Sequence, residues 1–486
     1  MHSLRVQKWI VWSIFLALLF APVSPALAEY SEDELERFDQ FEEVFWYLSE
    51  YHIDAPDSDQ LMDWAIYGMI LSLEDPHTEF FTDEELEQFY QSLEGSFVGI
   101  GVMIQLTEDG ELQINDVIPE GPAERAGVEA NDIVTHINGQ EVHFTELEEA
   151  SSHLTGEEGT AVQVTVQREQ NSETTSHTYS ITREEISLPL VESEWLDDSV
   201  GVIRLHSFGS EVVPLVEEHL QKLQAEGAQH VILDLRDNPG GYLNAALELA
   251  ELFKEQGVVM HVRDRSDEQI AYEISEGQAF DLPLVVLVNG LSASASEIFT
   301  GFVQDHEVGT VMGTQTYGKG TVQTLIPLET SGALKISVEE YYTPDRNPVH
   351  QRGITPDIAV ENHNFQLPKA YGYLVGKNEI QVTSEGSVHW NGVEEALQED
   401  ILIQSNGEQY IQVRALAQWF GYDFGWDNAT QSIVFEVEEQ DYLIPKQHEA
   451  VLIAHDTSYL SLDALEGILP LNISEEDQVT VIADQS

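Results

Sequence analysis

The sequence predicts an α/β multidomain protein. At 486 residues the chain is too long for one ordinary domain, and roughly three or four are expected at about 100–200 residues each. Between residues 200 and 300, short apolar runs typical of buried strands alternate with amphipathic stretches typical of helices. This alternation favours a core of stacked βα units. The segment before the core has helical periodicity, and other segments alternate like strands.

The first 28 residues have the pattern of a secretory signal peptide. Arg5 and Lys8 precede an apolar stretch over residues 10–21, and a small-x-small cleavage site ends at Ala28. We expect cleavage after Ala28. The alternative, an uncleaved membrane anchor, is disfavoured because this apolar stretch is shorter than the ~20 residues of a spanning helix. The mature chain is therefore expected to be extracytoplasmic, either secreted or associated with the cell envelope, without a stable membrane span.

The chain is strongly acidic, with 20 Lys and Arg against 88 Asp and Glu and a formal net charge of −68. Removing the signal peptide takes away two positive charges and no acidic residue, so the mature charge becomes −70. Nucleic acid and anionic membranes are poor partners for such a surface. Because the acidic residues are spread along the chain and salt screens their repulsion, we hypothesise a saline or alkaline habitat.

Two features missing from the sequence exclude particular kinds of catalytic and metal-binding site. The chain has no cysteine, which excludes disulfides, thiolate metal sites and a cysteine nucleophile. It also has no His-Glu-x-x-His, so that type of zinc protease is unsupported. We expect no cofactor and no metal.

Residues 29–94 are predicted to form a helical domain. Apolar residues recur there at intervals of three and four, the spacing of amphipathic helices. Asp75-Pro76 interrupts the pattern before a third helix over residues 83–92. Short helices of this kind need a partner to cover their apolar faces. The apolar positions are Leu35, Phe38, Phe41, Val44, Phe45, Leu48 and Tyr51, then Leu61, Ala65, Ile66, Met69, Ile70 and Leu73.

Residues 95–169 are predicted to form a second domain, rich in strands. It opens with a glycine-containing segment made of Val98, Gly99, Ile100 and Gly101. This is not a dinucleotide-binding loop, because the third glycine is absent and a strand follows where a helix is required. A helix is expected over residues 144–154, and the polar residues 169–178 are expected to be a linker.

The third domain, residues 170–365, contains a serine at a predicted helix start. A buried strand over residues 282–288 ends at Asn289-Gly290 and is followed by Ser-Ala-Ser-Ala-Ser-Glu, residues 292–297. Free N–H groups at a helix start stabilise negative charge, as an oxyanion intermediate requires. A serine also needs a base to take its proton.

Lys319 is the candidate base. Only seven lysines follow Ala28, and this one stands between two glycines in Tyr-Gly-Lys-Gly-Thr-Val-Gln, residues 317–323. Burial lowers the pKa of a lysine, so a buried lysine can act as a general base near neutral pH.

These two motifs together resemble the carboxyl-terminal processing proteases, also called tail-specific proteases. The resemblance implies that Ser294 is the nucleophile, that Lys319, 25 residues later, is the general base, and that Gln323 orients the lysine. Alone, each motif could be a helix cap or a surface charge, but the spacing matches without a gap.

The turn Asp-Asn-Pro-Gly-Gly after a buried strand over residues 230–236 also resembles this family. The resemblance implies an oxyanion hole made of two backbone N–H groups. One belongs to Ala295 and the other to Gly240, with Gly241 as the second choice. A plain strand-to-helix turn is the alternative. His206 and Asp234 could in principle complete a Ser-His-Asp triad, but the Gly-x-Ser-x-Gly elbow is missing.

Residues 96–168 resemble a PDZ domain. PDZ domains bind an extended chain at a sheet edge and hold its terminal carboxylate on backbone N–H groups, which implies that Val98, Gly99, Ile100 and Gly101 bind peptide. Glycine permits the close approach. A PDZ fold that serves only for packing is the alternative. The family resemblance spans residues 29–360, and for the N-terminal helices it implies a homodimer.

Residues 376–486 contain an internal repeat. The stretch from Tyr410 to Leu416 matches the stretch from Tyr459 to Leu465 at an offset of 49 residues, and Ile433 matches Ile482. The first copy resembles the copper amine oxidase N-terminal-like (stalk) domain, although no copper ligands are evident. Attachment to the cell envelope and simple stabilisation of the core are both open as its role.

The sequence therefore predicts an exported serine endopeptidase that recognises the C-terminal tails of protein substrates through its PDZ domain. The alternative is a catalytically idle PDZ scaffold that presents envelope proteins to another enzyme.

Overall fold

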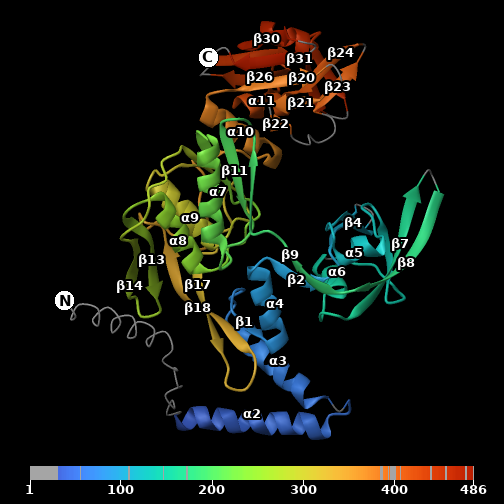
Figure 1. Ribbon diagram of the computed structural model, residues 1–486, viewed down its shortest axis with the longest axis vertical. Coiled ribbons are helices and arrows are strands. Elements are labelled where there is room, and N and C mark those ends of the chain that lie inside the picture. The colour runs from blue at the N-terminus through green and yellow to red at the C-terminus, as the bar shows by residue number, and fades with distance from the viewer. Residues whose placement is uncertain are drawn as a thin grey trace. The chain divides into compact units, whose positions relative to one another are not determined.

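The computed structural model describes residues 31–54, 56–107, 110–145, 147–170, 173–383, 387–391, 393–394, 401–405, 407–437, 440–454, 457–476 and 479–484 (Figure 1). The predicted signal peptide and its cleavage site lie outside these residues. Contacts divide the chain into two compact units, one ending at Phe80 and the other beginning at Phe81. Among the described residues, no helix is both long and apolar enough to cross a membrane.

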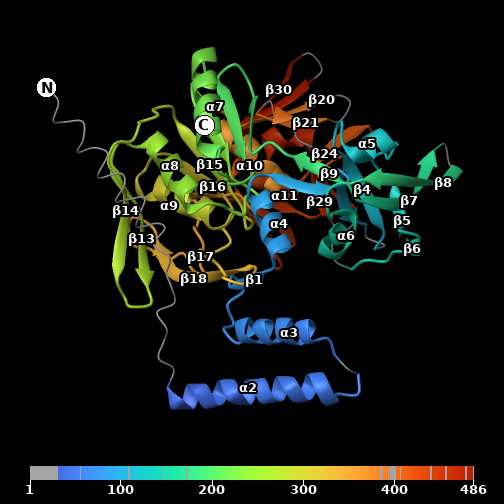
Figure 2. The same cartoon turned by 60° about the horizontal axis from the view of Figure 1, so that its bottom comes forward.

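The first unit is built from α2 (Glu32–Tyr51) and α3 (Ser58–Leu71), which Figure 2 shows as two separate helices. Ser31 begins α2 with a capping box, because its Oγ accepts the N–H of Glu34 and the Glu34 carboxylate accepts the N–H of Ser31. No residue of either helix is buried. Large apolar side chains such as Phe38 (55% exposed) and Trp64 (66% exposed) are therefore accessible within this unit. β1 (Glu79–Phe81) follows.

The second unit contains a six-stranded sheet in the order β10-β11-β12-β15-β16-β19. The last five strands are parallel, and β10 runs antiparallel to β11. Parallel sheets are covered on both faces, so their strands are continuous apolar runs; every residue of β15 is buried. The strands are β10 (Val191–Trp195), β11 (Val200–Leu205), β12 (His230–Asp234), β15 (Leu284–Val288), β16 (Thr310–Gly313) and β19 (Ile358–Ala359).

Three helices connect these strands: α7 (Val212–Glu226), α8 (Leu243–Phe253) and α9 (Ala295–Asp305). Each contributes a buried apolar stripe to the main core, as Leu220, Leu249 and Phe299 do. This alternation confirms the α/β class and the βα units predicted from the sequence.

In a second, antiparallel sheet of the same unit, β17 pairs with β18, β18 pairs with β13, and β13 pairs with β14. Its strands are β17 (Thr321–Pro327), β18 (Ala333–Tyr342), β13 (Gly257–Asp264) and β14 (Gln269–Ile274). β17 begins two residues after Lys319. The sheet therefore fixes the C-terminal end of residues 317–320, here called the lysine segment. The hairpin of β13 and β14 was not predicted from the sequence.

Residues 102–182 form a separate sheet in the order β3-β4-β5-β7-β8, with its own apolar core. The expected linker over residues 169–178 is wrong: these residues end β7 and make most of β8. Thr174, Thr175 and Thr178 in that stretch are of a residue type that favours strands, and β8 pairs with β7 along its length. The elements are β3 (Val102–Leu106), β4 (Leu112–Val117), α5 (Pro122–Ala126), β5 (Ile133–Ile137), β6 (Gln140–Glu141), α6 (Leu147–Leu154), β7 (Ala161–Gln170) and β8 (Glu173–Thr182).

Two short strands lie at the ends of this region in sequence. β2 (Ser96–Gly99) pairs antiparallel with β9 (Glu184–Ser187). α4 (Asp83–Leu93) directly precedes β2, as the predicted third helix does.

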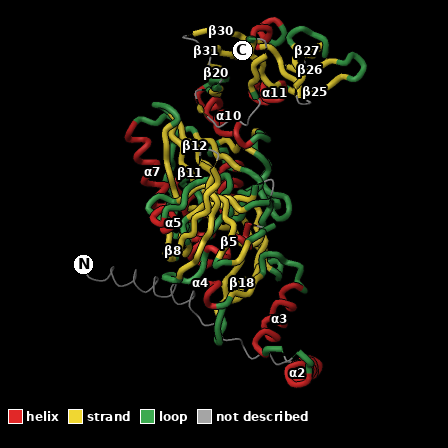
Figure 3. The backbone as a smooth tube through the Cα atoms, turned by 90° about the vertical axis from the view of Figure 1, so that its right-hand side faces the viewer, coloured by secondary structure: helices red, strands yellow, loops and turns green. Residues whose placement is uncertain are grey.

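After α10 (His363–Val375), the C-terminal region has a third apolar core that includes Trp390, Trp419 and Phe435, and Figure 3 shows it as mostly strand. The internal repeat has a structural counterpart: β24 (Glu408–Gln412) leads into α11 (Val413–Phe420), and β29 (Thr457–Ser461) leads into the 3₁₀-helix η1 (Leu462–Gly467). β24 and β29 pair antiparallel. The other strands are β20 (Glu379–Thr383), β21 (Val388–Trp390), β22 (Val393–Glu394), β23 (Leu402–Ser405), β25 (Asp423–Asp427), β26 (Ser432–Val437), β27 (Gln440–Pro445), β28 (Val451–Ala454), β30 (Leu471–Glu476) and β31 (Val479–Asp484).

Candidate active site

Ser294 stands in the turn between β15 and α9, directly before the first residue of the helix. Its backbone has φ +55° and ψ −114°, a conformation that residues with a side chain rarely adopt. Such a conformation is strained and persists only when surrounding contacts hold it. The neighbours Ala293 and Ala295 are small and buried, so other segments can approach the turn closely.

The three serines of the motif have different environments. Ser292 is fully buried and its Oγ donates to Leu235 O over 2.8 Å. Ser296 is also fully buried, and its Oγ donates to Asn238 O over 3.0 Å. Ser294 is partly exposed and lines a cavity. Of the three, the middle serine is therefore the one that a substrate can reach.

The turn after β12 packs directly against Ser294, and only glycine fits there. A Cβ on Gly240, whose φ is +102°, would lie 2.7 Å from Ala293 O and 2.8 Å from Ser294 Cβ. A Cβ on Gly241, whose φ is +150°, would clash with Phe208 O. Both the positive φ angles and the close contacts explain the two glycines.

The backbone N–H groups around Ser294 are the candidates for an oxyanion hole. The N–H of Gly240 donates to Asn238 Oδ1 over 2.9 Å, and Asn238 is fully buried. The N–H groups of Gly241 and Ala295 make no hydrogen bond within the described part of the chain. In this conformation Gly241, the second choice from the sequence, has the available N–H, and the assignment of the hole to Gly240 stays a prediction.

Glu297, three residues after Ser294, connects the serine to the lysine segment. Its Oε2 accepts the N–H of Ser294 (3.0 Å) and of Lys319 (2.9 Å). Its Oε1 accepts the hydroxyl of Thr316 (2.6 Å) and the N–H of Gly318 (2.7 Å). Burial raises the pKa of Glu297, and these four donors only partly oppose that shift. One fully buried carboxylate thus fixes the backbone at both Ser294 and Lys319.

Tyr341 contacts the same two segments from β18. Its hydroxyl donates to Ser294 O over 3.2 Å, and its backbone N–H donates to Gly320 O over 2.9 Å. The ring is almost completely buried. Neither Tyr341 nor Glu297 was predicted to have a role in the site. The capping-box spacing of Ser294 and Glu297 was a signal for the carboxylate; the contact of Tyr341 depends on strand pairing that spacing does not predict.

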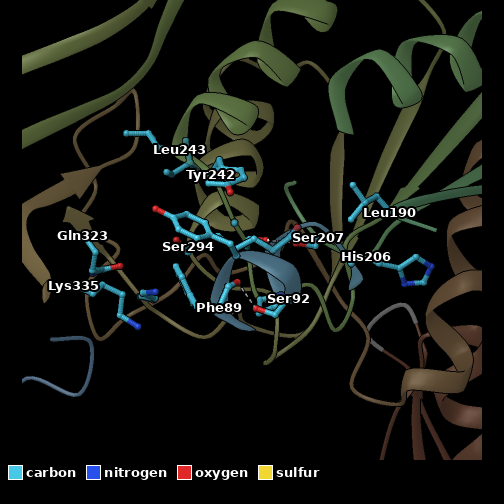
Figure 4. A pocket seen from close by; sticks show the side chains of 18 of the residues that line it. Phe89, Ser92, Leu190, His206, Ser207, Tyr242, Leu243, Ser294, Gln323 and Lys335 are labelled. Atoms are coloured by element: carbon cyan, nitrogen blue, oxygen red, sulfur yellow. Dashed lines mark hydrogen bonds between the residues drawn. The ribbon is translucent and has the colours of Figure 1, made fainter. Parts of the chain in front are cut away.

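A cavity of about 820 Å³ brings Gly240, Ser294, Lys319 and Gln323 together. Figure 4 shows Ser294 near its centre, with Gln323 and Lys335 on one side and His206 on the other. Lys319 is partly buried. Most of the remaining wall is apolar: Phe89, Tyr90, Leu93, Leu188, Pro189, Leu190, Tyr242, Leu243, Ile298, Val322, Leu325 and Tyr341.

The side-chain amide of Gln323 donates hydrogen bonds to residues of β17 and β18. Nε2 donates to Thr321 O (3.1 Å), Thr321 Oγ1 (2.8 Å) and Ser337 Oγ (3.2 Å). These bonds fix the amide plane beside the cavity. Orientation of Lys319 by Gln323 stays a prediction.

His206 and Asp234 do not make a pair with each other. His206 lines the cavity, but its Nε2 is 2.9 Å from Glu192 Oε2. The buried carboxylate of Asp234 binds Arg236 (2.7 Å) and Arg204 (3.3 Å). These contacts are not those of a Ser-His-Asp triad, in which the carboxylate orients the imidazole.

The predicted peptide-binding segment leads into the edge strand of its sheet. Val98 and Gly99 belong to β2, whereas Ile100 O and Gly101 O accept the N–H groups of Ala123 (2.8 Å) and Ile118 (3.0 Å). β3, which follows, pairs only with β4 among the described strands and lies beside α6. An edge strand next to a helix is the arrangement in which an added peptide strand binds. Binding by Val98, Gly99, Ile100 and Gly101 themselves stays a prediction.

Comparison with known proteins finds two matching protein families. Residues 199–360 match the family described as Peptidase family S41, and residues 113–168 match the PDZ domain. The carboxy-terminal-processing protease of Bartonella bacilliformis is 31% identical over 385 residues, which cover 78% of this chain and 88% of that protein. The chain belongs to the carboxy-terminal-processing proteases of peptidase family S41.

Other similar proteins have related names. The "Probable CtpA-like serine protease" of Staphylococcus aureus strain COL is 29% identical over 387 residues, covering 78% of this chain and 77% of that protein. The solved photosystem II D1 C-terminal processing protease is 25% identical, with a TM-score of 0.44, and the match covers 67% of this chain and 93% of that one. The prediction of a carboxy-terminal-processing serine protease with a PDZ domain is confirmed.

Proposed function

We propose that this S41 protease is an exported endopeptidase that captures protein C-terminal tails in its PDZ domain and cleaves peptide bonds with a Ser294–Lys319 dyad. The observation that supports the dyad most is Glu297, which binds the backbone N–H groups of both residues beside one cavity. The apolar lining of that cavity suits an extended, unfolded substrate segment.

The reaction begins with uncharged Lys319. Its amine takes the proton from Ser294 Oγ while Oγ attacks the carbonyl carbon of the scissile bond. The N–H groups of Ala295 and of Gly240 or Gly241 stabilise the tetrahedral oxyanion. Lys319 then gives its proton to the leaving amine, and the C–N bond breaks. Lys319 then deprotonates a water molecule, which attacks the acyl-enzyme. Lys319 returns that proton to Ser294 Oγ as the ester C–O bond breaks, and the product leaves as a carboxylic acid.

The test of the dyad compares the full mature chain with its Ser294→Ala and Lys319→Ala variants on an unfolded protein with an apolar C-terminal tail. Both variants are expected to fold and to lose cleavage. Lys222→Ala, a change of an exposed lysine on α7, is the matched control and should cleave normally. Cleavage by purified Lys319→Ala would contradict the dyad, and absence of cleavage by every form would favour a non-catalytic scaffold.

Tail recognition has a separate test. The PDZ domain is proposed to bind the free terminal carboxylate, so the same substrate with an amidated C-terminus should have a higher KM and an unchanged kcat. Equal KM values for the acid and the amide would contradict carboxylate recognition while leaving the dyad intact.

The domain boundaries, the dimer and the location are part of the same proposal. We assign residues 1–28 to a signal peptide, 29–94 to a dimerisation domain, 95–182 to the PDZ domain, 183–365 to the protease core and 376–486 to a stalk-like domain. The boundary expected at residue 169 moves to residue 182 because β8 pairs with β7. The uncovered apolar faces of α2 and α3 support a homodimer. Sedimentation of the mature chain with and without residues 29–80 tests it, because only the longer form should be dimeric.

A further inference from the structure

Tyr341 contacts Ser294 and the residue that follows Lys319 from a third element, β18. It lies near the end of β18, is 2% exposed, and lines the cavity that contains Ser294. Its hydroxyl donates to Ser294 O (3.2 Å) and its backbone N–H donates to Gly320 O (2.9 Å). Because Gly320 directly follows Lys319, Tyr341 connects the turn that contains Ser294 to the segment that contains Lys319.

The bond to Ser294 O matters because of where that oxygen lies in the chain. The carbonyl of Ser294 and the N–H of Ala295 belong to one planar peptide unit, so fixing the oxygen also fixes the direction of the N–H. The oxygen accepts two further bonds, from the N–H groups of Glu297 (2.8 Å) and Ile298 (3.0 Å). Both of these donors belong to the first turn of α9 itself. The bond from Tyr341 is the one that anchors the peptide to β18.

The strain at Ser294 makes this anchor useful. A residue at φ +55° and ψ −114° relaxes to another conformation unless its neighbours hold it. Rotation of the Ser294–Ala295 peptide would turn the Ala295 N–H away from a bound carbonyl. A polarised carbonyl also makes the N–H of the same peptide a stronger donor.

The Tyr341 hydroxyl is a hydrogen-bond donor near neutral pH. Burial, followed by the charge of Glu297, raises the pKa of Tyr341 well above its ordinary value. The phenol is therefore neutral, and it cannot itself take the proton of Ser294. Its contribution must come through its hydrogen bond.

We propose that Tyr341 is a positioning residue of the peptidase reaction, whose hydroxyl holds the Ser294–Ala295 peptide so that the Ala295 N–H points at the developing oxyanion. This inference rests on the proposed role of Ser294 as the nucleophile. It adds a residue that acts through another residue and does not need to touch the substrate.

The variant Tyr341→Phe tests the proposal, because it removes one oxygen and keeps the ring that fills the core. A neutral hydrogen bond has a net value that corresponds to about a 2-fold to 13-fold change in rate. We expect kcat to fall by that factor while KM is unchanged. Tyr342→Phe is the matched control, since the Tyr342 hydroxyl donates to Glu340 (2.9 Å) and does not line the cavity; its kcat should equal that of the unaltered protein.

A second measurement separates positioning from mere packing. A peptide boronate forms a tetrahedral adduct with a nucleophilic serine and needs the oxyanion hole, whereas a substrate peptide bound to a Ser294→Ala background does not. Tyr341→Phe should weaken boronate inhibition by the same factor as kcat and leave the affinity of the peptide for the Ser294→Ala background unchanged.

Three results would overturn the proposal: an unaltered kcat in Tyr341→Phe, a raised KM at constant kcat, or equal weakening of the boronate and of the ground-state peptide. The control on the proposed function is independent. Cleavage by Ser294→Ala would refute the nucleophile itself, whereas a fully active Tyr341→Phe beside an inactive Ser294→Ala would refute the positioning role alone.

Discussion

The carboxylate of Glu297 accepts four hydrogen bonds inside the protein, two on each oxygen. In Glu297→Gln one oxygen becomes an NH₂ group, which faces two donors and can accept from neither. Each hydrogen bond to a charged group contributes about 1.5–3 kcal/mol, so two lost bonds correspond to about 3–6 kcal/mol. Removing a buried charge offsets part of this loss. We expect a net decrease of about 2–4 kcal/mol in the free energy of unfolding.

The effect of Glu297→Gln on catalysis should exceed its effect on stability. Two of the four bonds hold the backbone of Ser294 and Lys319, and a displacement of about 1 Å at reacting groups can lower the rate about 100-fold. We therefore expect kcat to fall at least about 100-fold under conditions where urea denaturation shows the variant to be folded. Glu248→Gln, at an exposed position of α8, controls for the charge change alone.

The reasoning about Glu297 would be refuted by one clear result. If Glu297→Gln has the kcat and the urea midpoint of the unaltered protein, the four hydrogen bonds do not hold the site together. A fall in stability with an unaltered kcat would leave the carboxylate with a structural role only.

Further predictions concern the oxyanion turn, a buried ion pair and the net charge. Gly240→Ala should lose cleavage and labelling of Ser294, because its Cβ would lie 2.7 Å from Ala293 O; normal cleavage would show that the turn can relax. Burial alone would raise the pKa of Asp234, but Arg236 lowers it overall. The ion pair therefore stabilises the fold above about pH 4, the pKa of an unfolded aspartate, and this contribution disappears as the pH falls through the lower folded pKa. Asp234→Asn should cost about 3–5 kcal/mol at pH 7 and less in acid, and a pH-independent difference in urea midpoints would contradict this. With a net charge of −68, the urea midpoint should rise between 0.1 M and 1 M NaCl, as the Debye length falls from about 10 Å to about 3 Å; a constant midpoint would count against adaptation to salt.

The parts of the site that follow from local sequence were predictable. The apolar strand before Asn289, the small residues around Ser294 and the glycines beside Lys319 all act through short-range backbone geometry. In the structure the buried hydroxyls of Ser292 and Ser296 donate to backbone carbonyls. The middle serine, Ser294, differs because it lines the cavity.

The missed parts depend on contacts between distant segments. Tyr341 reaches Ser294 only because β18 lies beside the lysine segment, and no spacing rule gives that pairing. Residues 169–178 are polar and resemble a linker, yet cross-strand pairing of β7 with β8 makes them a hairpin. The amide N–H groups of Gln323 bind Thr321 and Ser337, contacts that also depend on strand pairing, and its orientation of Lys319 stays a prediction.

Site-specific labelling of Ser294 tests the central claim most directly. A fluorophosphonate probe reacts with an activated serine, and peptide mapping identifies which serine carries it. We predict a label on Ser294 of the unaltered protein and, because a general base contributes about 10²–10⁴-fold, labelling at least about 100-fold slower in Lys319→Ala. A label on Ser292 or Ser296, or equal rates in the two proteins, would contradict the Ser294–Lys319 dyad.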